Sequence, residues 1–130
     1  MGEFLGGTII FFYVLTILKY VFKWISRIFD KLIKKNESFY NIYKKVSLFF
    51  AKNHRIFGIL TFLAVIAHFI VQFSTIGLSI TGLIAALIMM LQVSLGIYGV
   101  KVKNKWKYWV LVHRIIAFII LIAVIIHIAL

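Results

Sequence analysis

The hydrophobic residues of this chain fall into four long runs that polar segments separate. The runs cover approximately residues 4–25, 56–73, 79–100 and 108–130. Each run has about 18–23 residues, the length of helix that crosses the roughly 30 Å hydrocarbon core of a bilayer. The pattern therefore predicts an all-α integral membrane four-helix bundle, with residues 1–130 forming a single transmembrane domain.

The polar segment between the first two runs has a pattern of its own. Its first part, KWISRIFDKLIKK, is predicted to continue the first helix beyond the membrane, and Asn36, Glu37 and Ser38 offer a break with a new N-cap. Over approximately 36–53 we expect a basic amphipathic helix at the cytoplasmic face, either separate from the second span or continuous with it. Its apolar stripe consists of Phe39, Ile42, Tyr43, Val46, Phe49 and Phe50.

Composition supports a membrane protein and narrows its partners. The chain is 64% hydrophobic, whereas soluble domains are closer to half apolar. Its 15 Lys and Arg against 3 Asp and Glu give a net charge of +12. Because the basic residues border the apolar runs and form no soluble basic face, we expect no nucleic acid partner. Their natural partners are the membrane lipids of the anionic inner leaflet.

The same basic residues orient the chain in the membrane. All 15 lie either between Lys19 and Arg55 or between Lys101 and Arg114. The positive-inside rule places both segments in the cytoplasm and both termini outside, in an N-out/C-out arrangement. The second and fourth spans are therefore parallel, and we expect a multi-pass protein of the cell (plasma) membrane.

These two parallel spans contain an internal repeat. HRIFGILTFLAVIAH (His54–His68) and HRIIAFIILIAVIIH (His113–His127) share 7 of 15 positions without gaps and contain all 4 histidines of the chain. Fourteen residues correspond to nearly four helical turns, so each histidine pair lies on one helix face, about 21 Å apart along the axis. The sequence therefore predicts two levels: His54 with His113 inside, and His68 with His127 outside.

Four explanations are open for histidines inside a membrane span. They could bond to one another or to backbone carbonyls, relay protons, bind zinc or copper, or ligate haem iron. Proton relays usually contain Asp or Glu, which no span offers, and zinc prefers more ligands than two. The absence of cysteine excludes iron–sulfur ligation and covalent c-type haem attachment. Two histidines at each level suit two b-type haems best, since a porphyrin leaves two axial positions to the protein.

Further residues are candidates for the two haem sites. Glycines in the ligand helix and in the third span could let a macrocycle approach, although ordinary helix packing explains them equally well. Arg55 and Arg114 follow the inner histidines and could pair with haem propionates, or could anchor the helices at the interface by snorkelling. The candidate glycines of the haem sites are Gly58, Gly96 and Gly99.

The paired motifs resemble the di-haem cores of membrane b-type cytochromes. H-R-x-x-G with a second histidine downstream (His54, Arg55, Gly58, His68) is similar to the ferric reductase-like transmembrane domain, and W-x3-H-R-x12-H in the last span is similar to its second ligand helix. The resemblance covers residues 54–127 and implies bis-histidine haem b at both levels. The chain departs from that family in having four spans instead of about six and no flavin or nicotinamide domain.

We therefore expect an electron-transfer subunit without a catalytic site of its own. The expected function is transmembrane electron transfer through two haem b groups, linking a cytoplasmic flavoprotein or ferredoxin-type subunit with the quinone (menaquinone) pool or an outer acceptor. Two alternatives stay open. One is a stand-alone ferric reductase-like exporter of electrons, and the other is a haem-free membrane scaffold or channel subunit.

Overall fold

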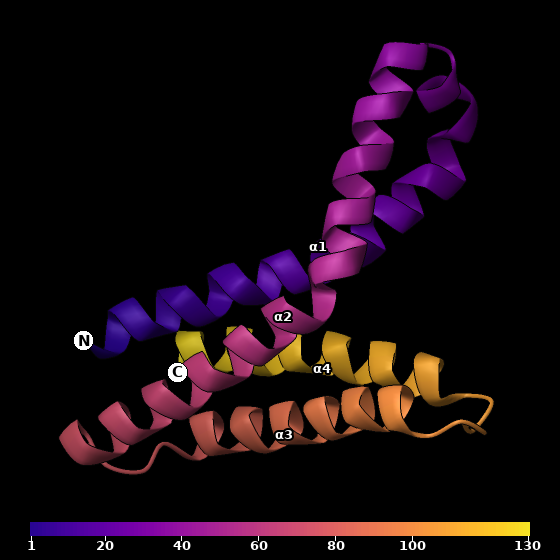
Figure 1. The fold of residues 1–130 in the computed structure, drawn as a ribbon. Coiled ribbons are helices and arrows are strands. Elements are labelled where there is room, and N and C mark those ends of the chain that lie inside the picture. Colours follow the sequence, from indigo (N-terminus) through magenta and orange to yellow (C-terminus); the bar gives the residue numbers. More distant parts are fainter. The chain divides into compact units, whose positions relative to one another are not determined.

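A computed structural model describes residues 1–130, and the chain is entirely helical apart from short connections. Its helices are α1 (Gly2–Lys34), α2 (Glu37–Thr75), α3 (Ile80–Lys101) and α4 (Trp109–Ala129) (Figure 1). All four are long and apolar enough to cross a membrane. The predicted all-α class is confirmed, with the four helices that a membrane bundle needs, and the chain is a multi-pass membrane protein.

The first two helices are longer than a bilayer is thick. With 33 and 39 residues, α1 and α2 extend about 50 and 58 Å. The break between them comes where it is predicted, because the Asn36 side-chain oxygen accepts a hydrogen bond from the Phe39 backbone N–H at 3.1 Å. The amphipathic segment predicted near 36–53 is the first half of α2 and is continuous with the second span.

The last two helices begin and end within a residue of their predicted spans. Gly77 precedes α3 with φ +94°, a left-handed conformation that glycine adopts without strain. The Ser79 hydroxyl then accepts a hydrogen bond from the Gly82 backbone N–H at 3.3 Å and caps the helix. Helices α3 and α4 pack against each other (Figure 1).

The chain forms two compact units, which we describe separately. The terminal unit comprises Met1–Gly6 and Phe62–Leu130, and the hairpin unit comprises Gly7–Thr61. In the hairpin unit, α1 and α2 meet where the rings of Phe22 and Phe50 stack with centroids 5.5 Å apart. The Tyr43 hydroxyl donates a hydrogen bond to the Phe22 carbonyl and joins the same two helices.

Most large apolar side chains of all four helices are exposed. Examples are Phe118 at 63% and Ile70 at 61%. A soluble monomer rarely exposes apolar patches larger than a few hundred Å², so lipid is the environment that suits this surface. The few buried residues are Tyr13, Ile33, Thr61, Met89, Ile116 and Ile120.

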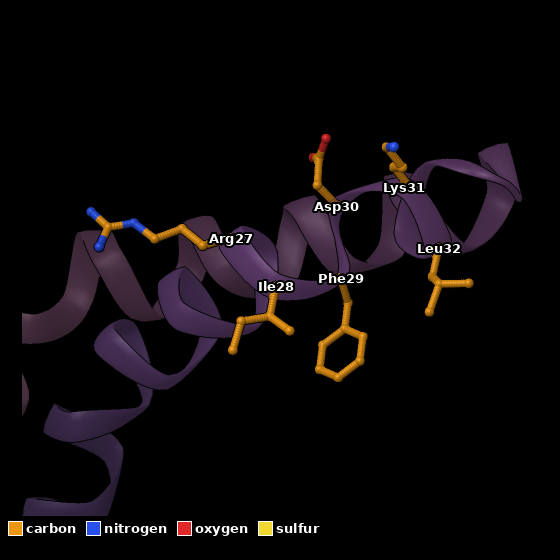
Figure 2. Close-up of a pocket in the computed structure, with 6 residues that line it drawn as sticks. All are labelled: Arg27, Ile28, Phe29, Asp30, Lys31 and Leu32. Atoms are coloured by element: carbon orange, nitrogen blue, oxygen red, sulfur yellow. The ribbon is translucent and has the colours of Figure 1, made fainter.

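Helix α1 bends near its C-terminal end. Phe29 has φ −110° and ψ 21°, outside the helical range, although residues on both sides are helical. The chain contains no proline, so no proline ring causes the bend. A pocket at the bend is lined by residues 27–32 (Figure 2).

Candidate haem-ligand site

His68 of α2 and His127 of α4 lie beside each other in the terminal unit. Their ring centroids are 6.4 Å apart, and the ring planes make an angle of 81°. With a metal–nitrogen bond of about 2 Å and roughly 1 Å from that nitrogen to the ring centre, two imidazoles that share one metal have centroids about 6 Å apart. The observed separation therefore fits a pair of axial ligands.

The hydrogen bond of His68 defines which of its ring nitrogens can bind a metal. His68 Nδ1 lies 3.1 Å from the carbonyl oxygen of Gly2. A carbonyl only accepts, so Nδ1 carries the proton, and the neutral ring keeps its lone pair on Nε2. Metal-bound histidines generally donate their second N–H in this way, which fixes the ring orientation. His68 thus has the tautomer that an axial ligand requires.

His127 has a corresponding partner on α3. Its Nδ1 lies 3.0 Å from the Thr81 hydroxyl oxygen, and when Nδ1 is the donor to this oxygen, Nε2 keeps the lone pair that a metal needs. Glycines accommodate both rings of the outer pair. A Cβ atom added to Gly82 would come within 3.0 Å of His127 Cε1, and one added to Gly6 would lie 3.7 Å from His68 Cε1. The close approach of His127 thus depends on the missing side chain at Gly82.

The inner histidines belong to different units, so each is described in its own. His54, in the hairpin unit, has its Nδ1 3.0 Å from the carbonyl oxygen of Thr16. As in His68, Nδ1 donates to a carbonyl oxygen and Nε2 keeps the lone pair. The edge of the Tyr20 ring also contacts His54, with centroids 5.6 Å apart. His54 is therefore held by α1 in the tautomer of a metal ligand.

His113, in the terminal unit, has a different partner. The Gln92 amide nitrogen lies 3.2 Å from His113 Nε2, and since an amide nitrogen only donates, Nε2 is the acceptor. The lone pair is again on Nε2, but the Gln92 amide lies in front of it. The Gln92 carbonyl oxygen is buried without a hydrogen-bond partner, which costs about 1–3 kcal/mol. A metal ion on His113 would require Gln92 to rotate away.

The glycines predicted for the haem sites differ in their surroundings. A Cβ on Gly96 would lie 3.8 Å from His113 Cε1, so the structure brings this glycine beside an inner histidine. A Cβ on Gly99 would come within 2.3 Å of the Trp109 ring, which shows that Gly99 accommodates an indole. Gly58 has nothing within 4 Å of its added Cβ.

The two predicted arginines have exposed side chains. Arg55 lies directly after His54 on α2, and Arg114 directly after His113 on α4. Both positions agree with a role at the membrane interface, where a long stem lies along apolar surface and the guanidinium reaches water or a polar headgroup.

The sequence-based prediction missed the hydrogen-bond partners of the histidines: Gly2, Thr16, Thr81 and Gln92. For the partners on α3, the sequence does contain a pattern that could have predicted them. Gly82 and Gly96 are separated by fourteen residues, as are His127 and His113 in the opposite order along the chain. Antiparallel packing of α3 on α4 across their short connection therefore places one glycine against each histidine, with Thr81 and Gln92 nearby.

Known proteins provide no independent assignment of this site. Comparison of the chain with protein families, with curated proteins and with solved structures finds no match. The chain contains no cluster of three or more His, Cys, Asp or Glu side chains that could hold a metal ion. The candidate site consists of paired histidines and their partners.

Proposed function

We propose that this protein is a membrane cytochrome b subunit that transfers electrons across the cell membrane through two b-type haems. His68 and His127 would hold the outer haem, and His54 and His113 the inner one. Haem b would supply the reversible one-electron chemistry of its iron. The hydrogen-bonded tautomers of His54 and His68 and the 6.4 Å separation of the outer rings fit this group.

One observation carries the proposal: the outer pair has both Nδ1 atoms hydrogen-bonded to oxygen and its rings at axial-ligand separation. Polar groups inside a membrane are costly and need partners. A partnership between the two histidines alone would not require both Nδ1 atoms to be oriented by other groups. A shared metal does benefit from it, because ring orientation and ligand basicity both depend on those bonds.

The residues around the histidines would position and shield the site. The Gly2 carbonyl and the Thr81 hydroxyl would orient the outer ligands, and the Thr16 carbonyl would orient His54. Gln92 would release His113 Nε2 when the inner site is filled. The surrounding apolar residues would keep water away from the iron, which affects its reduction potential.

The electrons would come from and go to other molecules, because the sequence contains no nucleotide-binding motif. The basic segments, with both termini outside, favour a cytoplasmic flavoprotein or ferredoxin-type subunit with an acidic surface as redox partner. The membrane quinone (menaquinone) pool or an outer acceptor would complete the path. Direct reduction of an external acceptor would make the protein a ferric reductase-like exporter.

A second candidate function is a haem-free scaffold or channel subunit, and His113 favours it. The Gln92 amide already donates to His113 Nε2, the atom that an iron would need. Groups of the protein also bind Nδ1 of the other three histidines. The histidines could thus serve only to join helices through buried hydrogen bonds.

A visible spectrum of the full-length protein, purified from membranes with haem supplied during expression, separates the two candidates. The cytochrome proposal predicts α and β bands on reduction and a b-type pyridine hemochrome. A colourless protein that is still helical by circular dichroism would support the haem-free candidate.

A further inference from the structure

In the bend segment of α1, Arg27–Lys34, charged and apolar side chains lie on opposite sides of the helix. Figure 2 shows Arg27, Asp30 and Lys31 on one side of the ribbon. Ile28, Phe29 and Leu32 point to the other side (Figure 2) and are exposed at 53%, 44% and 65%. A helix with one cationic and one apolar side is typical of segments that lie in a membrane interface.

Asp30, the only acidic residue of the bend segment, forms an ion pair with a lysine of the same segment. Lys34 Nζ lies 2.9 Å from Asp30 Oδ2, one helical turn away. The hydrogen bond to Asp30 raises the pKa of Lys34, which favours the charged form of the lysine. Arg27 and Lys31 have no such acidic partner. The charged side of the bend segment therefore offers two uncompensated cations to an external anion.

Counted from the predicted end of the first span, Arg27 lies within the headgroup layer and Lys31 just beyond it. The first apolar span is predicted to end near Ile25, and Arg27 and Lys31 follow it by about 3 and 9 Å along a helix. The headgroup layer of a bilayer is roughly 5–8 Å thick on each side. The bend at Phe29 changes the direction of α1 between these two cations.

We propose that the bend segment is a binding site for an anionic phospholipid headgroup of the cytoplasmic leaflet. Arg27 and Lys31 bind the headgroup phosphate, while Ile28, Phe29 and Leu32 enter the acyl-chain boundary. An acidic protein would satisfy the cations but would leave the apolar side uncovered, so charge and apolarity together favour lipid. The proposal is independent of haem binding.

The test titrates full-length, detergent-solubilised protein with phosphatidylglycerol and with phosphatidylcholine and follows bound lipid by native mass spectrometry. Each basic residue near an anionic surface contributes about fivefold in affinity, so Arg27→Gln combined with Lys31→Gln should weaken phosphatidylglycerol binding roughly 25-fold. The matched control, Lys44→Gln with Lys45→Gln, removes the same charge from the interfacial part of α2 and should weaken binding less, because these lysines lie outside the bend segment. Equal losses in both pairs, or none in the first, would overturn the proposal.

A second measurement keeps the proposal testable if the double variant does not fold. In a variant with Phe29→Trp and with Trp24, Trp106 and Trp109 changed to Phe, the new indole reports on the bend segment. Nanodiscs of equimolar phosphatidylglycerol and phosphatidylcholine should allow brominated acyl chains to quench it more strongly than phosphatidylcholine alone. Equal quenching in both membranes contradicts the site. Absence of quenching in both membranes shows that the segment faces water and also overturns the proposal.

Discussion

The imidazoles of His68 and His127, 59 residues apart in the chain, have ring centroids 6.4 Å apart. Each ring has its Nδ1 within hydrogen-bonding distance of an oxygen, the Gly2 carbonyl in one case and the Thr81 hydroxyl in the other. Both Nε2 atoms are thereby left for a further ligand. This arrangement is the basis of the proposed outer haem. It leads to three predictions, and the contact between Gln92 and His113 leads to a fourth.

Changing His68→Ala should remove one haem and spare the other. The outer iron would lose an axial ligand, whereas the inner pair of His54 and His113 would be unchanged. The haem-to-protein ratio, measured by pyridine hemochrome, should fall by half. Phe69→Ala changes the neighbouring residue as a control and should retain both haems. Equal losses in the two variants would count against the ligand assignment.

Changing Thr81→Val should weaken outer haem binding about 10–100-fold, the usual range when the outer partner of a metal ligand is lost. The isosteric valine keeps the volume but cannot hydrogen-bond to His127 Nδ1. The rate of haem transfer to an apo-globin acceptor measures this effect. Thr81→Ser restores the hydroxyl and should restore slow transfer. If serine and valine behaved alike, the hydroxyl would have no orienting role.

Changing Gly82→Ala should disturb the outer level, because the added Cβ would come within 3.0 Å of His127 Cε1. We expect a displaced ring, a shifted α band and partial loss of one haem. Gly7→Ala is the matched control, since Gly7 belongs to neither proposed haem site and its added Cβ meets nothing within 4 Å. There we expect an unchanged spectrum and a gain of about 0.5–1 kcal/mol in helix stability. An unaltered spectrum in both variants would argue against a haem at His127.

Changing Gln92→Leu should leave the inner haem in place or increase its occupancy. The leucine removes both the amide in front of His113 Nε2 and a buried carbonyl oxygen without a partner. In haem-free protein, the ¹⁵N resonance of His113 Nε2 should shift by losing a hydrogen bond worth about 1 kcal/mol. Loss of the inner haem in this variant would instead make Gln92 a required partner of the iron-bound site.

The fold followed from local patterns in the sequence. Four apolar runs of spanning length predict the four helices, and Asn36 predicts the break between α1 and α2 because its side chain can cap a helix. The continuity of the interfacial segment with the second span could not be decided, because a helix shows no sequence boundary where it leaves the bilayer. The bend at Phe29 was not predicted, since neither proline nor glycine marks it.

The sequence predicted the histidines of the candidate site but not their hydrogen-bond partners. The histidines are conspicuous because polar residues are rare in apolar spans, and their equal spacing places each pair on one helix face. Their partners are not conspicuous. The Gly2 and Thr16 carbonyls carry no side-chain signal, and the roles of Thr81 and Gln92 depend on the register of α3 against α4. Predicting them requires pairing residues across the connection between the two helices.

The haem-to-protein ratio of the purified full-length protein tests the central claim most directly. Pyridine hemochrome analysis together with protein quantification gives this ratio in one experiment. The four histidines, arranged as two ligand pairs, predict two b-type haems per chain. A folded, helical protein that contains no haem after expression with haem supplied would contradict the claim.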